Sequence, residues 1–166
     1  MHIDDNHLYH GAALIQIAEH KKFTSINSFR VSRRTSRSAY IVNSDIGVYL
    51  KYATKPSKAH SEYSFTFRTA HLKELSAIAR GGRRAFVALV CVEAREICCV
   101  SRAQLITMIG QRRAATGRRE ENNTVLVHAL PGERFRVYMN APGVRNAVLG
   151  DPLLVARNSF PKLLFD

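Results

Sequence analysis

The residues of this sequence best suited to hold a ligand are its clustered arginines and lysines. The clusters are Arg33, Arg34 and Arg37; Lys51, Lys55 and Lys58; Arg80, Arg83 and Arg84; and Arg112, Arg113, Arg118 and Arg119. We expect each cluster to lie at a connection between secondary-structure elements. Cations grouped there, around a neutral interior, are typical of a surface that follows phosphate groups.

The overall charge of the chain supports the same expectation. Its 166 residues include 25 Lys and Arg but only 13 Asp and Glu, which gives a formal net charge of +12. Folded proteins usually carry acids and bases near balance, so this excess favours a polyanionic partner over evenly spread solubilising charge. Four tyrosines near the first two clusters could stack on bases: Tyr40, Tyr49, Tyr52 and Tyr63. The predicted nucleic-acid contacts are Arg33, Arg34, Arg37, Lys55, Lys58, Arg83, Arg84, Arg112 and Arg113.

One acid stands out near the N-terminus. Leu8, Ala12 and Ile15 recur at helical spacing, which predicts a helix that begins at Asp5 or Asn6 with these residues facing the core. Glu19 continues the same stripe. A carboxylate on an apolar face is costly unless it is paired. Glu19 is therefore either a helix-end residue that reaches solvent or an arginine, or an inward-pointing functional acid.

Several kinds of active site are missing from the sequence. It contains no GxxxxGK[ST] phosphate loop, GxGxxG fingerprint, GxSxG elbow or HExxH motif. Cys91 is expected in the core. Cys98 and Cys99 are adjacent on a strand, so at most one is expected to be buried, and neither has the features of an activated nucleophile.

The hydrophobic patterns predict the order α-β-β-β-β-α-β-β-α-β-β, a mixed α/β (α+β) fold whose central sheet is flanked by helices. Residues 86–92 are apolar on both faces, which is typical of a central strand covered on both sides. A helix over 69–79 should end at Gly81. Residues 111–123 are expected to form an exposed loop, and 124–139 a C-terminal hairpin.

The same patterns divide the chain into a single α/β domain over residues 1–140 and an irregular segment over 141–166 that packs on it. The N-terminus is polar and acidic, unlike a signal peptide, and the longest apolar run is too short to cross a bilayer. The protein is therefore expected in the cytoplasm, without a membrane partner.

From Leu8 to Val92 this arrangement resembles the PD-(D/E)XK, or restriction-endonuclease-like, nuclease superfamily. In that superfamily a helix Glu, a strand Asp and an (E/D)-x-K pair hold one or two Mg²⁺ ions, and metal and lysine activate water for attack on a phosphodiester. Matched by position, Glu19 is the helix acid, Asp45 the strand acid and Lys51 the lysine. Tyr49 occupies the position of the acid in the E-x-K pair. Glu62 could approach Lys51 and replace that missing acid as a ligand.

The resemblance implies a catalytic set of Glu19, Asp45, Lys51 and Glu62, with Mg²⁺ held by the three acids. Two functions follow: a metal-dependent DNA endonuclease-like phosphodiesterase, or a non-catalytic nucleic-acid-binding or adaptor module on the same fold. DNA is a more natural partner than RNA in either case. The oligomeric state stays open, with a homodimer among the alternatives.

Overall fold

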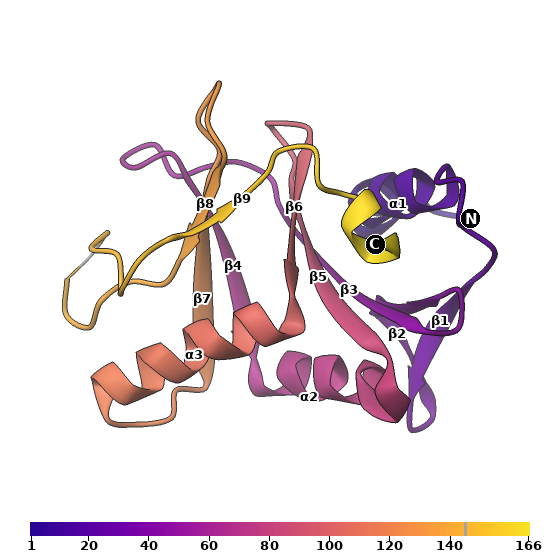
Figure 1. Ribbon diagram of the computed structural model, residues 1–166, viewed down its shortest axis with the longest axis horizontal. Coiled ribbons are helices and arrows are strands. Elements are labelled where there is room, and N and C mark those ends of the chain that lie inside the picture. Colours follow the sequence, from indigo (N-terminus) through magenta and orange to yellow (C-terminus); the bar gives the residue numbers. More distant parts are fainter. Residues whose placement is uncertain (145) are drawn as a thin grey trace.

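The structure is a computed structural model that describes residues 1–144 and 146–166 (Figure 1). Its elements are α1 (Asp5–Ala18), β1 (Ile26–Val31), β2 (Arg34–Val42), β3 (Ile46–Ala53), β4 (Glu62–Arg68), α2 (Thr69–Ile78), the 3-10 turn η1 (Arg80–Gly82), β5 (Arg84–Cys91), β6 (Glu96–Ser101), α3 (Arg102–Thr116), β7 (Asn122–His128), β8 (Phe135–Tyr138), β9 (Leu153–Val155) and α4 (Lys162–Phe165). The mixed α+β class predicted from the sequence is confirmed. The segment predicted to be irregular contains the short elements β9 and α4.

The strands form two sheets. Sheet A has the order β1-β2-β3-β5-β6, in which only β3 and β5 run parallel. Sheet B has the order β4-β7-β8-β9 and is antiparallel throughout. The predicted C-terminal hairpin is β7 and β8, and it belongs to a second sheet that also takes in β4.

Strand β5 is interior, as its apolar run predicts. It pairs with β3 on one side and β6 on the other. Val87 and Leu89 face a core shared with α2 and sheet B, whereas Ala88 and Val90 face a core shared with α1 and α4. Because both faces of the strand are covered, both must be apolar.

The turns follow local sequence signals. Asn43 and Ser44 have φ of 51° and 67°, and this pair of left-handed residues makes the tight connection between β2 and β3. Helix α2 ends at Ile78 with a right-handed cap at Ala79, close to the predicted end, and Gly81, with φ of 74°, interrupts the 3-10 turn that follows.

Helix α1 packs with a different face from the one predicted. Its buried residues are His10, Ala13 and Ile17, while Leu8 and Ile15 are 55% and 60% exposed. The helix is apolar on two opposite sides, and the side with Ala13 and Ile17 packs against β3 and β5. Glu19 is the exposed C-cap residue of this helix, so it does not point into the core.

Two basic segments also differ from expectation. Arg34 to Arg37 belong to β2 rather than to a loop, and α3 continues to Thr116. The extension of α3 is explained by the helix-forming residues 112–115 and by Gly117, whose φ of 71° provides the left-handed cap.

The cysteines are all buried, including both Cys98 and Cys99, because β6 is covered on both faces. Burial raises the pKa of the Cys99 thiol to about 12, so the expectation of unreactive cysteines fits this environment. In the described part of the chain, no helix is long and apolar enough to span a bilayer.

Candidate nucleic-acid interface

The acids matched to the nuclease superfamily do not meet at Lys51. The Nζ atom of Lys51 lies 5.2 Å from the ring centroid of Phe67 on β4, on the face of sheet A that is turned toward sheet B. Burial lowers the pKa of Lys51, and neighbouring Arg68 lowers it further. Helix α1 packs on the opposite face of sheet A, so Glu19 and Lys51 lie on different sides of the sheet.

The other two acids are displaced along the strands. Asp45 precedes β3 and is about 20 Å from Lys51 along the extended chain. Glu62 begins β4, about 17 Å along the strand from Phe67, over which the Lys51 ammonium lies. Glu62 is buried beside Tyr138, whose pKa is raised by burial and by a hydrogen bond with Glu62.

These positions do not fit a magnesium centre. Among residues 1–144 and 146–166, no group of three or more His, Cys, Asp or Glu side chains is placed to hold a metal ion. The set Glu19, Asp45 and Glu62 is therefore not assembled, and the convergence on Lys51 that the resemblance implied is absent from the fold.

Several arginines predicted to contact nucleic acid also make contacts within the protein. Arg37 forms an ion pair with Asp4. The Nε of Arg83 donates to the carbonyl of Ile78 at 2.8 Å, which satisfies the end of α2. Arg84 donates to the carbonyls of Asp166 and Leu164 at 2.6 and 2.9 Å, and so holds the C-terminal helix against sheet A.

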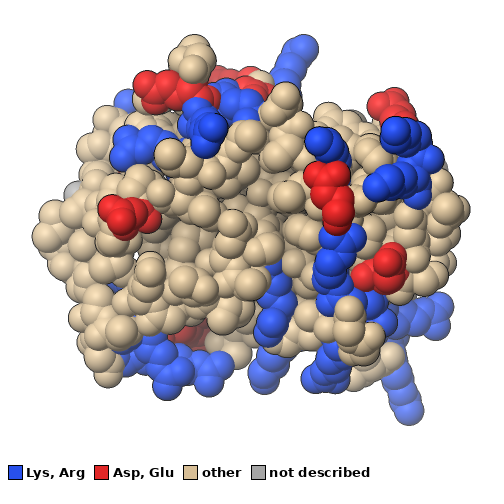
Figure 2. All heavy atoms as spheres, in the orientation of Figure 1, with Lys and Arg blue, Asp and Glu red and all other residues tan. Residues whose placement is uncertain are grey.

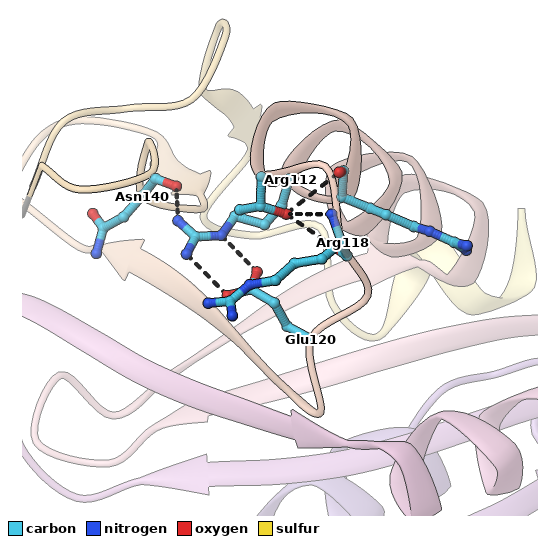
Figure 3. A network of polar contacts seen from close by, with 6 residues as sticks. Arg112, Arg118, Glu120 and Asn140 are labelled. Atoms are coloured by element: carbon cyan, nitrogen blue, oxygen red, sulfur yellow. Dashed lines mark hydrogen bonds and ion pairs between the residues drawn. The ribbon is translucent and has the colours of Figure 1, made fainter.

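Arg112 is also a structural residue (Figure 3). Its Nε and Nη2 atoms donate to the two carboxylate oxygens of Glu120 at 2.8 and 3.1 Å, and Nη1 donates to the carbonyl of Asn140 at 2.7 Å. The guanidinium hydrogen bond lowers the pKa of Glu120. These contacts fasten α3 to the segments before β7 and after β8.

Lys55 and Lys58 lie far from the basic residues of α2 and α3. They occupy the loop between β3 and β4, and β4 then runs from this loop to the start of α2. A strand of this length spans about 20 Å, so the loop and α2 lie at opposite ends of sheet B (Figure 1).

The pairing of the strands brings α2 and α3 together. Helix α2 follows β4 and α3 precedes β7, and in that antiparallel pair Arg68 lies opposite Asn122. Likewise α2 precedes β5 and α3 follows β6, and in the antiparallel pair of β5 and β6 Phe86 lies opposite Ser101. The helices therefore run antiparallel between the same ends of the two sheets, at the base of the molecule in Figure 1.

A groove of about 830 Å³, here called the α2–α3 groove, separates the two helices. Three aliphatic residues of its lining, Leu72, Ile106 and Ile109, are here called the floor, and Thr69, Ser76 and Asn123 add uncharged polar groups to the lining. Its walls carry five exposed cations: Lys73, Arg80, Arg113, Arg118 and Arg119. In the described part of the chain, none of the five forms an ion pair.

The two acids of the groove already have partners. Glu74 accepts a hydrogen bond from Ser36 Oγ at 3.2 Å, and Glu120 is held by Arg112. None of the five wall cations forms an ion pair with these carboxylates, although Arg118 lies close enough to Glu120 to help lower its pKa, and the net positive potential of the walls is available to a ligand.

The tip of the β1–β2 hairpin extends this basic surface. Val31 lines the groove and is the strand partner of Arg34, and Arg33 lies in the turn between them. Both arginines are exposed. In Figure 2, Lys and Arg side chains project along the lower margin of the molecule, the side on which α2, α3 and this hairpin lie in Figure 1.

The structure thus gathers part of the predicted binding set and adds to it. Of the predicted residues, Arg113 lines the groove, and Arg33 and Arg34 lie at the adjoining hairpin tip. Lys73, Arg80, Arg118 and Arg119 also line the groove. A signal for the α2 residues is present in the sequence. Lys73, Ala77 and Arg80 recur at helical spacing, opposite the buried Leu75 and Ile78.

The predicted base-stacking tyrosines do not form a platform here. Tyr49 and Tyr63 are buried in the core, and Tyr52 packs against Tyr9 with ring centroids 4.9 Å apart. Aromatic stacking on these three side chains is therefore not part of the surface that the groove presents.

No family model matches the sequence, and neither the curated proteins nor the solved structures provide a significant match. The function is therefore inferred from the geometry and charge of the groove.

Proposed function

We propose that the protein binds nucleic acid in the α2–α3 groove and on the adjoining hairpin tip, as a non-catalytic binding module. One observation carries the proposal: in the described part of the chain, five exposed cations that form no ion pair line a single groove, where they outnumber its two acids, Glu74 and Glu120. Cations of this kind displace the counterions condensed on a phosphate backbone, and that release drives association. Arg33 and Arg34 continue the same track beyond the groove.

DNA is the first proposed ligand and RNA the second. Both are included because cations that contact phosphate position a backbone without reading its sequence. The metal-dependent nuclease is not proposed, since its carboxylates lie apart from Lys51 in this fold. A cytoplasmic location fits the proposal, because three free cysteines are typical of a reducing compartment.

The test compares two double variants that each remove two positive charges. Arg118→Ala with Arg119→Ala changes the groove wall, and Lys55→Ala with Lys58→Ala changes the distant β3–β4 loop. Fluorescence anisotropy with labelled duplex and single-stranded DNA measures affinity over a salt series that starts at about 50 mM. Circular dichroism confirms that each variant is folded.

We expect the wild-type protein to contact roughly 4–6 phosphates, which gives a slope of log K against log[salt] of about −4 to −5 on duplex DNA. The groove variant should bind more weakly, with a slope flatter by about 2, and the loop variant should stay close to wild type. Equal losses in both variants would mean that net charge alone causes binding. That result, or no binding at the lowest salt, would overturn the proposal.

A further inference from the structure

The lining of the α2–α3 groove combines apolar and charged surface. Its floor is aliphatic, and Ile106 is 40% exposed there, which makes it one of the large hydrophobic side chains left open to solvent. The cations stand on the walls and at the hairpin tip. A ligand that complements this lining presents both apolar surface and negative charge.

This mixed lining constrains how a nucleic acid can lie in the groove. A phosphate packed against the aliphatic side chains of Leu72, Ile106 and Ile109 would lose water without gaining a cation or a hydrogen bond from them, which is unfavourable. A phosphate at the rim keeps its hydration and reaches Lys73, Arg113 or Arg119. The apolar floor is then left for the bases.

Only an unpaired strand can use the floor in this way. In a duplex the bases are paired and stacked inside, and the phosphate backbones form the outer ridges that a groove would receive. In a single strand the bases can turn away from the backbone and pack against protein side chains. An acidic amphipathic helix also combines apolar and negative surfaces, but the cations continue past the groove to Arg33 and Arg34, which suits a longer chain of regularly spaced charge.

We infer that the α2–α3 groove holds a single-stranded segment of nucleic acid, with bases on the floor at Ile106 and phosphates at the cationic rim. This inference rests on the proposed function and narrows its ligand. Because the floor is aliphatic, its contact with bases is not sequence-specific, and the phosphates supply most of the affinity.

The test uses three labelled probes at one salt concentration: the oligothymidine dT12, a DNA duplex of the same length, and an abasic strand that keeps the same phosphates but lacks bases. Ile106→Ala is the groove variant. Ile15→Ala is its matched control, because Ile15 is 60% exposed on α1, across sheet A from the groove. An acidic amphipathic peptide serves as a fourth probe.

We expect wild-type protein to bind dT12 more tightly than either the abasic strand or the duplex. Ile106→Ala should weaken dT12 binding about five- to tenfold, because it removes three carbons from a partly buried contact, and it should leave abasic binding unchanged. Ile15→Ala should leave all the affinities unchanged.

The failures of the two proposals are distinguishable. Equal binding of dT12 and the abasic strand, or tighter binding of the duplex, overturns the single-strand inference and leaves nucleic-acid binding standing. Binding of the acidic peptide with none of the nucleic acids overturns both. Loss of dT12 affinity in Ile15→Ala equal to that in Ile106→Ala also overturns the inference, since the effect would not belong to the groove floor.

Discussion

Neighbouring arginines in this protein have different roles, and the role of each depends on whether its guanidinium already has hydrogen-bond partners. Arg112 gives its donors to Glu120 and to a backbone carbonyl, whereas adjacent Arg113 is exposed on the groove wall. A guanidinium already engaged by a carboxylate in bidentate geometry would have to give up strong hydrogen bonds to meet a phosphate. The sequence predicts where cations cluster, but it does not predict which of them meet a partner, because those partners arrive from other elements.

Glu120→Gln tests the structural role of the Arg112 pair. The hydrogen bond from Arg112 lowers the pKa of Glu120, so the pair stabilises the fold above the ordinary pKa of a glutamate and loses this contribution as the pH falls through the lowered value. We expect Glu120→Gln to reduce the free energy of unfolding by about 1 kcal/mol at neutral pH. Urea denaturation across a pH series should show the difference from wild type vanishing in acid. A difference that persists there would contradict the assignment.

Elements with one unambiguous pattern are the ones that the sequence predicts correctly. Strand β4 alternates as expected, with Phe65 and Phe67 buried, and β5 is interior because both of its faces are apolar. Helix α1 has two apolar faces. The spacing of its apolar residues therefore predicts that a helix forms and where it begins, but it does not predict which face packs against the sheet. The end of α3 was missed because its last turn is basic, and exposed basic residues suit a helix as well as a loop.

A pair of substitutions tests the orientation of α1. Ile17 is fully buried and Ile15 is 60% exposed, although they lie two residues apart. Ile17→Ala should cost about 2–5 kcal/mol of unfolding free energy through the cavity it leaves, and Ile15→Ala should change stability by about 0.5 kcal/mol or less. Chemical denaturation of both variants measures the contrast. The reverse order of stabilities would mean that the predicted stripe of Leu8, Ala12 and Ile15 is the packing face after all.

At the scale of the whole molecule, the pairing of β4 with β7 determines where the groove forms and where Glu62 lies. These strands are far apart in the sequence, yet Tyr63 lies opposite Val127. The pairing places the start of α2 beside the end of α3 and so creates the groove. It also places Glu62 in sheet B, away from Lys51 on β3. Local periodicity carries no information on which strands pair, so neither the groove nor the separation of the acids could be predicted from it.

The separation of the acids leads to a prediction about catalysis. An Mg²⁺-dependent phosphodiesterase needs carboxylates close enough to share the ion, with the lysine near the attacked phosphate. Here Glu19 lies across sheet A from Lys51, and Glu62 begins β4, at the other end of the strand from Phe67. We therefore expect plasmid, linear DNA and RNA to stay intact with Mg²⁺, Mn²⁺ or EDTA, while binding at low salt is weaker with either divalent ion than with EDTA, because these ions compete for the phosphates. Lys51→Ala, which lies outside the groove, should bind like wild type once circular dichroism shows that it is folded. Cleavage that EDTA stops and Lys51→Ala abolishes would show that the acids and the lysine come together in a conformation other than this one, and would restore the nuclease as the function of the chain.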